Sequence, residues 1–187
     1  MKIALIVIAV LLVLAIGVFG WAVGERNSLV TEQQSVKAQW AQVDVALQRR
    51  ADLIPNLVQT VKGYAKQEQT VFTNIANARA ALGGAQTPQQ KMQANGQLDS
   101  ALSRLLVIVE NYPQLKSDRN FQELQFELAG TENRIAVERR KYNEAVQVYN
   151  RDIQLFPRNV IAGMFGFQAE TYFQTEAGAR TAPKVEF

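Results

Sequence analysis

Residue types that carry out chemistry in most enzymes are scarce in this sequence. Its 187 residues include no histidine and no cysteine, which excludes Ser-His-Asp and Cys-His catalysis, disulfides, and metal sites built from imidazole or thiolate. Some hydrolases use a lysine three residues after a serine, but no serine here has that spacing. Neither a P-loop pattern nor the glycine pattern G-x-G-x-x-G occurs. We therefore predict no enzymatic activity, no metal site and no cofactor.

Three charged residues near Pro55 are the first candidates for a role other than catalysis. Arg49, Arg50 and Asp52 precede this proline. They could bridge to a facing helix, or they could form a polar site for a partner. The candidate bridging partners on the facing helix are Arg134, Glu138 and Arg139.

Two Tyr-Asn pairs are the second candidates. Tyr142-Asn143 and Tyr149-Asn150 lie seven residues apart, so both rings fall on one face of a helix with both amides beside them. Two interpretations stay open. The rings pack in a helical core with their hydroxyls at its edge, or they form a ladder between protomers.

The charge balance does not favour a nucleic-acid partner. The chain has 20 basic and 17 acidic side chains, and the basic residues are scattered among the acidic ones. Nucleic-acid binding usually needs a clustered basic face with accessible aromatic side chains. We therefore expect no nucleic-acid partner.

The elements that position these residues begin with an apolar segment. Residues 3–24 carry no charge, and a helix of this length spans ~33 Å, enough for a bilayer core of ~30 Å. A cleaved signal peptide, with a weak site at Ala22-Val23-Gly24, and a buried core helix are the alternatives. We predict a retained transmembrane anchor over residues 1–26, with the lipid bilayer as a partner.

Two further features of this anchor bear on contacts and orientation. Gly20 and Gly24 form a GxxxG pattern, which allows helices to approach closely in lipid. Trp21 is typical of the headgroup boundary. Orientation is nearly undetermined by charge, because Lys2 and the α-amine on one side oppose Arg26 and Lys37 on the other.

Residues 27–187 form the second predicted domain, a helical bundle. Apolar residues recur at three- and four-residue spacing from about 27 to 82, which predicts a long helix that continues the anchor. Pro55 interrupts the pattern, so we expect a kink at residues 52–55 or a new helix capped by Asp52. Gly83-Gly84 predicts a left-handed helix end.

Two more helices follow. The second predicted helix covers about 88–112, with Thr87 and Gln90 as a capping box and Pro88 at its first position, and it should return antiparallel to the first. The third covers about 121–156, with Asn120 and Glu123 as a capping pair. Its seven-residue stripe comprises Phe121, Leu128, Ile135, Tyr142, Tyr149 and Phe156.

The C-terminal segment 157–187 is rich in large apolar residues and punctuated by glycine. We expect a short helix followed by an irregular strap. The segment could cover one end of the bundle, or it could present a patch to a partner or to lipid. The complete prediction is an all-α fold with an N-terminal transmembrane helix, a long antiparallel three-helix bundle, and this helix and strap.

Several stretches together resemble a known family. In chain order these are Gln48–Val58, Val61–Ala65, Thr131–Ala136, Tyr142-Asn143 with Tyr149-Asn150, Phe156-Pro157, Phe165–Phe167 and Tyr172-Phe173. They cover essentially the whole chain and resemble the bacterial LemA family. The resemblance implies a single-pass protein of the cell (inner) membrane with no established enzymatic activity and a loose link to envelope and internal-membrane biogenesis. Some members carry a lipid-modified cysteine in place of the anchor, which implies an extracytoplasmic bundle, although this chain lacks that cysteine.

Two hypotheses about function follow. The first is a membrane-anchored scaffold that forms homo-oligomers or recruits partners in membrane organisation or biogenesis. The second is a monomeric adaptor that presents its aromatic tail or helix faces to an envelope protease or another envelope membrane protein. The residues expected to serve partner or assembly contacts are Arg49, Arg50, Asp52, Asn133, Arg134, Tyr142, Asn143, Tyr149, Asn150, Phe165, Phe167, Tyr172 and Phe173, and those expected to serve membrane-helix contacts are Gly20 and Gly24.

Overall fold

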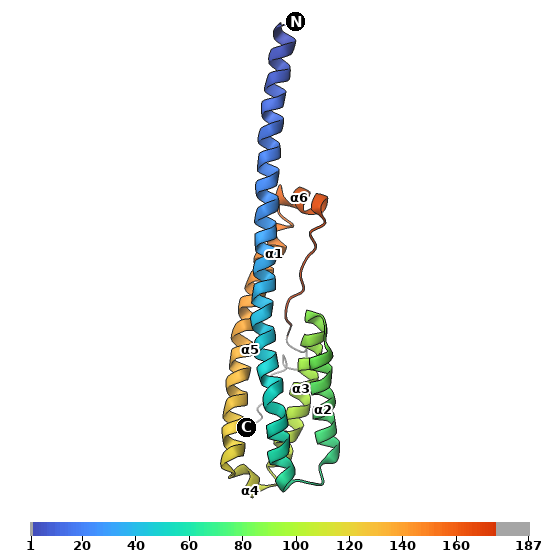
Figure 1. The fold of residues 1–187 in the computed structure, drawn as a ribbon, viewed down its shortest axis with the longest axis vertical. Helices are drawn as coiled ribbons and strands as arrows, with labels where there is room; N and C mark the ends of the chain where they lie inside the picture. The colour runs from blue at the N-terminus through green and yellow to red at the C-terminus, as the bar shows by residue number, and fades with distance from the viewer. Residues whose placement is uncertain (1, 175–187) are drawn as a thin grey trace, which may run out of the picture. The chain divides into compact units, whose positions relative to one another are not determined.

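The structure is a computed structural model that describes residues 2–174 (Figure 1). Every regular element in this range is a helix. The helices are α1 (Lys2–Tyr64), α2 (Gln69–Gly84), α3 (Pro88–Val109), α4 (Pro113–Lys116), α5 (Arg119–Asp152) and α6 (Arg158–Phe165). The predicted all-α fold, with a long apolar N-terminal helix and a short C-terminal helix before an irregular strap, is confirmed; residues 175–187 of the predicted strap lie outside the described residues.

The chain forms two compact units, and both α1 and α5 contribute to each. Unit 1 contains α1 as far as Gln39, the end of α5 from Asn143, α6, and the chain up to Tyr172. Unit 2 contains the described residues from Trp40 to Tyr142 together with Phe173 and Gln174. Each unit is described by itself below.

Helix α1 is continuous from the anchor to Tyr64, as the sequence predicted, and it passes through Pro55. Because proline has no N–H, it cannot donate to the carbonyl four residues earlier, on Ala51. Arg79 of α2 supplies the missing donor, since its Nε lies 2.9 Å from that oxygen. The alternative of a new helix capped by Asp52 is therefore wrong, and the helix continues through the proline.

The break falls later, at Ala65–Glu68, where a turn closes with the Glu68 amide donating to the Ala65 carbonyl at 3.2 Å. The predicted long helix over 27–82 is thus divided into α1 and α2, and unit 2 packs four main helices instead of three. Figure 1 shows α2 and α3 running side by side in unit 2. The second predicted helix therefore returns against α2.

The start of α3 confirms the predicted capping box. The Gln90 amide donates to the Thr87 hydroxyl at 3.2 Å, and the Thr87 amide donates to Gln90 Oε1 at 3.2 Å. The end of α2 differs from the prediction, because Gly83 and Gly84 remain helical and the chain leaves the helix through an extended Ala85. The one glycine with positive φ among the described residues is Gly166 at 73°, which ends α6.

The cap of α5 is also different from the predicted one. The Phe121 amide donates to Oδ1 of Asp118 at 3.0 Å, so Asp118 takes the role assigned to Asn120. Tyr64, near the end of α1, donates to the other oxygen of Asp118 at 2.8 Å. One carboxylate therefore caps α5 and ties it to α1 within unit 2.

The seven-residue stripe of α5 is buried over most of its length. Phe121, Ile135, Tyr142 and Tyr149 are all inaccessible to solvent or nearly so. The helix ends at Asp152, so Phe156 lies beyond it and is exposed. The apolar face that the sequence predicts therefore ends one repeat early.

Candidate interaction surfaces

The apolar start of α1 is long enough and apolar enough to cross a membrane. Its side chains from Ile3 to Gly20 are exposed in the described chain, which is unfavourable in water and favourable in lipid. Gly20 and Gly24 are exposed as well, and a Cβ added at either would meet no atom within 4 Å. Both glycines are thus open to a neighbouring helix.

Arg50 of α1 forms the polar centre of unit 2. Its Nη1 lies 2.6 Å from Asp99 Oδ1 on α3 and 2.7 Å from Glu132 Oε2 on α5, and it donates to Asn95 Oδ1 at 3.3 Å. The arginine is buried. The predicted bridge to the facing helix is present, but its partner on α5 is Glu132 and not one of the three residues considered from the sequence.

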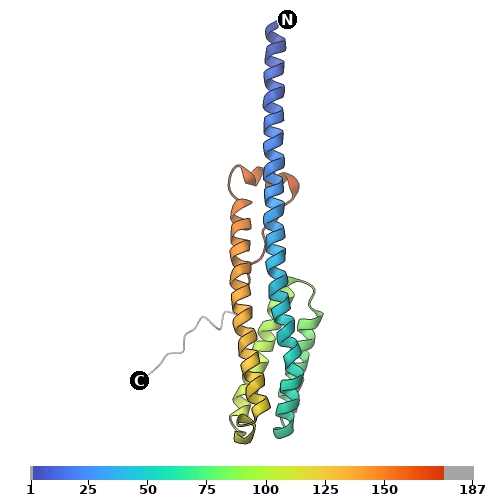
Figure 2. The same ribbon diagram turned by 60° about the vertical axis from the view of Figure 1, so that its left-hand side comes forward.

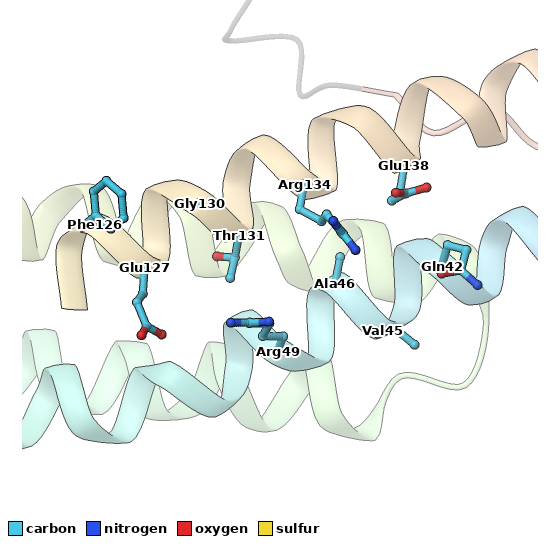
Figure 3. Close-up of a pocket in the computed structure, with 10 residues that line it drawn as sticks. All are labelled: Gln42, Val45, Ala46, Arg49, Phe126, Glu127, Gly130, Thr131, Arg134 and Glu138. Atoms are coloured by element: carbon cyan, nitrogen blue, oxygen red, sulfur yellow. The ribbon is translucent and has the colours of Figure 1, made fainter. Parts of the chain in front are cut away.

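The other two residues near Pro55 behave differently. Asp52 is exposed and accepts a hydrogen bond from Gln48 Nε2 at 2.9 Å. Arg49 is exposed on α1, and Arg134, also exposed, extends from α5 toward α1 (Figure 3). Neither arginine forms an ion pair or hydrogen bond with any residue from 2 to 174.

A groove of about 500 Å³ separates α1 and α5 on the surface of unit 2 (Figure 3). Its lining combines opposite charges with apolar and small side chains. The lining residues are Gln42, Val45, Ala46, Arg49, Phe126, Glu127, Gly130, Thr131, Arg134 and Glu138. Phe126 at one end of the groove is 81% exposed. No other element in the described part of the chain contributes to this lining.

An aromatic cluster lies elsewhere in unit 2. The rings of Trp40 and Tyr142 meet edge to face with centroids 5.3 Å apart, and Phe173 lies 6.3 Å from Trp40. The guanidinium of Arg139 lies 5.7 Å from the Phe173 ring. Tyr142 and Phe173 are buried, which supports core packing over a ladder of exposed rings.

Unit 1 has an arginine centre of its own, which no sequence pattern predicted. Arg158, the first residue of α6, lies with Nε 2.7 Å from Glu25 Oε2 and with Nη1 3.0 Å from Glu32 Oε1, both on α1. It also pairs with Asp152 at the end of α5. One guanidinium therefore joins three helices. These residues are up to 133 positions apart in sequence, which no local pattern reveals.

Two carboxylates around Arg158, those of Glu32 and Asp152, have pKa values shifted in opposite directions. Burial, and next the charge of Asp152, raise the pKa of Glu32 above its ordinary value of 4.5, although Arg158 opposes the shift. A hydrogen bond from Arg151 Nε, at 2.7 Å, holds the pKa of Asp152 below its ordinary value of 3.8. Glu32 therefore takes up a proton before Asp152 does as the pH falls.

The second Tyr-Asn pair has a structural role in unit 1. Asn150 donates to the Glu170 carbonyl and accepts from the Glu170 amide, both at 2.8 Å, and so holds the strap on α5. Tyr149 is fully buried, and burial, followed by the charges of Glu170 and Glu32, raises the pKa of its hydroxyl. Asn143 is partly buried.

The remaining candidates from the sequence divide by exposure. Phe167 is partly buried against Ile161, Ala162 and Leu29. In contrast, Phe165, Tyr172 and Asn133 are exposed. These three, with Arg49 and Arg134, remain available to a partner.

Residues 2–174 contain no group of three histidine, cysteine, aspartate or glutamate side chains placed to hold a metal ion. The polar centres at Arg50 and Arg158 join helices. The arrangement is suited to holding elements together and to offering surfaces.

A helix suited to crossing a bilayer, followed by a helical bundle, defines this chain as a membrane-associated all-α protein. The sequence profile of the LemA family matches residues 39–187. The chain therefore belongs to the LemA family, which confirms the resemblance found in the sequence.

Individual relatives agree with this assignment. The chain is 30% identical to magnetosome protein MamQ 2 of Paramagnetospirillum magneticum (strain AMB-1), over 95% of this chain and 74% of the relative. It is 26% identical to magnetosome protein MamQ of Magnetospirillum gryphiswaldense, over 83% of this chain and 66% of the relative. It is 24% identical to the LemA protein of Metamycoplasma hominis, over 87% of this chain and 75% of the relative.

Proposed function

We propose that this protein is a non-enzymatic, single-pass membrane scaffold whose helical bundle associates with a second copy of itself. The observation that carries this proposal is the open groove between α1 and α5 in unit 2. It holds exposed arginines with no partner among residues 2–174, beside an exposed phenylalanine. Aromatic and arginine side chains are the residue types most enriched at protein interfaces, so their exposure together is typical of an interaction site.

The charges of the groove fit a second copy. A two-fold contact brings the same surface together from both protomers, so each groove must complement itself. Arg49 and Arg134 supply positive charge, and Glu127, which is exposed and forms no ion pair with the described residues, supplies negative charge. Each protomer can therefore pair its arginines with the other protomer's Glu127.

The shape of the groove supports the same arrangement. Phe126 projects from α5, while Gly130 one turn later leaves open space, since a Cβ added there would meet no atom within 4 Å. In the proposed dimer, Phe126 of each protomer lies over Gly130 of the other. Aromatic anchors that fill small-residue gaps commonly dominate binding energy at interfaces.

The family relationship supports a role in an organised cell structure. Relatives in two organisms are named magnetosome proteins. By extension, the scaffold would act in membrane organisation or biogenesis at the bacterial envelope, with the lipid bilayer and other envelope membrane proteins as partners. We place the protein in the cell membrane and its bundle on the extracytoplasmic side. Labelling single introduced cysteines with an impermeant reagent on intact cells tests this orientation, because the chain has no cysteine of its own.

The alternative is a monomeric adaptor that presents its C-terminal aromatic residues or helix faces to an envelope protease or other membrane protein. The exposed side chains of Phe165 and Tyr172 favour it. The buried Phe173 and the partly buried Phe167 do not, because both are engaged within the chain. The adaptor also leaves the charged groove of unit 2 unexplained.

Particle mass separates the two functions. The full chain is reconstituted in nanodiscs large enough for two copies, and mass is measured across a concentration series. The scaffold predicts a dimer or larger species that Phe126→Asp dissociates. Val107→Asp is the matched control, since Val107 is also an exposed apolar residue of unit 2 but lies on α3, outside the groove. A single protomer at the highest concentration would instead favour the adaptor.

A further inference from the structure

Exposed apolar side chains gather on and just before α6. Val160 and Met164 lie one turn apart on the same side of α6 and are 52% and 74% exposed, and Phe156, two residues before the helix, is 82% exposed; we call these three residues the α6 apolar face. Leu155 and Phe165 beside them are each about half exposed. A helix that leaves this much apolar surface uncovered within its own chain normally has a covering surface elsewhere.

The buried face of α6 determines which part of α1 the helix packs against. Ile161 and Ala162 are buried against Leu29, and Ala22 packs at the edge of this small core. Figures 1 and 2 both show α6 beside α1. Leu29 follows Gly24, the last residue of the uncharged segment, by five residues, or ~8 Å of helix. Each headgroup layer of a bilayer is itself ~5–8 Å thick, so α6 reaches the headgroups of a bilayer whose hydrocarbon core ends at Gly24.

Arg158 holds α6 at this level. A helix of eight residues is not stable alone in water, and its position therefore depends on tertiary contacts. The ion pairs from Arg158 to Glu25, Glu32 and Asp152 attach the first turn of α6 to both α1 and α5. The α6 apolar face is consequently a fixed feature of unit 1.

We propose that α6 is a second membrane contact, in which the α6 apolar face enters the boundary between headgroups and acyl chains of the bilayer that α1 crosses. This proposal rests on the membrane anchor of the proposed function but not on self-association. Interfacial helices bind by burying an apolar face to this depth, with basic residues beside it. Arg26 suits that role, since it is exposed and its guanidinium lies 5.2 Å from the Phe165 ring.

Spin labels on single introduced cysteines measure the depth of α6 in the full chain. The protein is reconstituted in nanodiscs of zwitterionic lipid, and each label is compared for collision with oxygen, which concentrates in lipid, and with a water-soluble nickel chelate. Leu14→Cys, in the uncharged segment, is the lipid reference. Ser35→Cys, exposed on α1 about 16 Å beyond Gly24, is the aqueous reference. Met164→Cys is the test site, and unchanged helical content by circular dichroism verifies folding of each variant.

The proposal predicts an oxygen-to-chelate ratio at Met164 several-fold above that at Ser35 and below that at Leu14. Phe156→Asp, at another residue of the face, should lower the ratio at Met164 toward that of Ser35. A ratio at Met164 equal to that at Ser35, with Leu14 in lipid, would overturn the second contact and leave the anchor intact. An aqueous ratio at Leu14 would overturn both. Dipolar broadening between Met164 labels, with exclusion of both reagents, would assign the face to a second copy and also overturn the proposal.

Discussion

The two units of this protein each depend on one arginine, but the burial is reversed between them. In unit 2 the Arg50 side chain is 9% exposed, while its partners Asp99 and Glu132 are 41% and 52% exposed. In unit 1 the Arg158 side chain is 28% exposed, while Glu25, Glu32 and Asp152 are 23%, 19% and 11% exposed. Unit 2 thus surrounds a buried cation with hydrated anions, whereas in unit 1 three poorly hydrated anions surround Arg158, and Asp152 among them also pairs with Arg151.

This difference determines what each centre contributes. Loss of Arg50 leaves carboxylates that water can still solvate, whereas loss of Arg158 leaves Glu25 and Glu32 poorly hydrated beside Asp152, which keeps only Arg151 as a partner. Unit 1 therefore depends more strongly on its arginine. Since Arg158 also begins α6, the stability of the proposed second membrane contact depends on the same residue.

The largest effects should come from aromatic side chains that both units bury. Tyr142→Ala and Tyr149→Ala each remove a fully buried ring, and each should lower the free energy of unfolding by ~3–5 kcal/mol. Thermal unfolding of the full chain in nanodiscs measures the loss, with exposed Tyr172→Ala as the control. Unchanged unfolding with an altered particle mass would instead support the ladder between protomers.

The second-largest effects should come from replacing the two central arginines, and the loss of stability should differ between the units. We expect Arg158→Ala to cost ~3 kcal/mol, the low end for a buried ion pair that loses one partner, and Arg50→Ala to cost ~2 kcal/mol. Arg119→Ala, in a pair whose arginine is 91% exposed, should change stability by under ~0.5 kcal/mol. Hydrogen exchange should localise the loss of stability in Arg158→Ala to residues 152–170. An equal or larger loss for Arg50→Ala would refute the contrast between the centres.

The hydrogen bond from Arg79 to the Ala51 carbonyl, which replaces the backbone bond that Pro55 cannot make, lies within unit 2. Arg79→Ala leaves the Ala51 carbonyl without that donor and should cost ~1 kcal/mol. In a Pro55→Ala background the residue at position 55 regains its own N–H, so the same substitution at Arg79 should cost much less. A double-mutant cycle measures this coupling. Additive effects would show that Arg79 does not substitute for the missing bond.

The smallest effect should be the dependence on pH. Because the pKa of Glu32 is raised, its contribution to stability is complete below pH 4.5 and is lost as the pH rises through its folded pKa. The pKa of Asp152 is lowered, so its contribution is present above pH 3.8 and is lost as the pH falls further. Unit 1 should therefore gain stability from Glu32 on mild acidification and lose stability from Asp152 below that range.

Glu32→Gln provides the test of this sign. The variant should lack the gain above pH 4.5 while keeping the loss at lower pH, as followed by hydrogen exchange of unit 1. In unit 2, the pKa of Asp118 is lowered by the Phe121 amide and the Tyr64 hydroxyl, so Asp118 contributes only a loss on acidification. Identical pH profiles for the variant and the original chain would contradict the role of Glu32.

The regular parts of the fold were predictable because local physics determines them. Periodic apolar residues identified the buried faces of α1 and α5, and Val43, Ile54 and Tyr142 are buried as that period requires. The capping box at Thr87 was predictable for the same reason, since its donors and acceptors lie within four residues. Absence of charge over residues 3–24 identified the segment suited to a membrane.

Features that depend on distant residues were not predictable. The break after α1 lies among Lys66, Gln67 and Glu68, which are all good helix formers, so local propensity gives no signal there. The donor to the Ala51 carbonyl near Pro55 comes from Arg79 on another helix, and the centre of unit 1 depends on the contact of Arg158 with Glu25. The groove was not predictable for the same reason. The motifs around Arg49 and Arg134 identified both residues as candidates for contacts, but not that they line one groove between α1 and α5.

Cross-linking tests the proposed scaffold most directly. Cells express one copy carrying Phe126→Cys and another, with a different tag, carrying Gly130→Cys, and membranes are exposed to a mild oxidant. The proposal predicts a disulfide-linked product containing both tags, far exceeding that obtained when Val107→Cys replaces either partner. A product no more abundant than in the Val107 controls would contradict association through the groove.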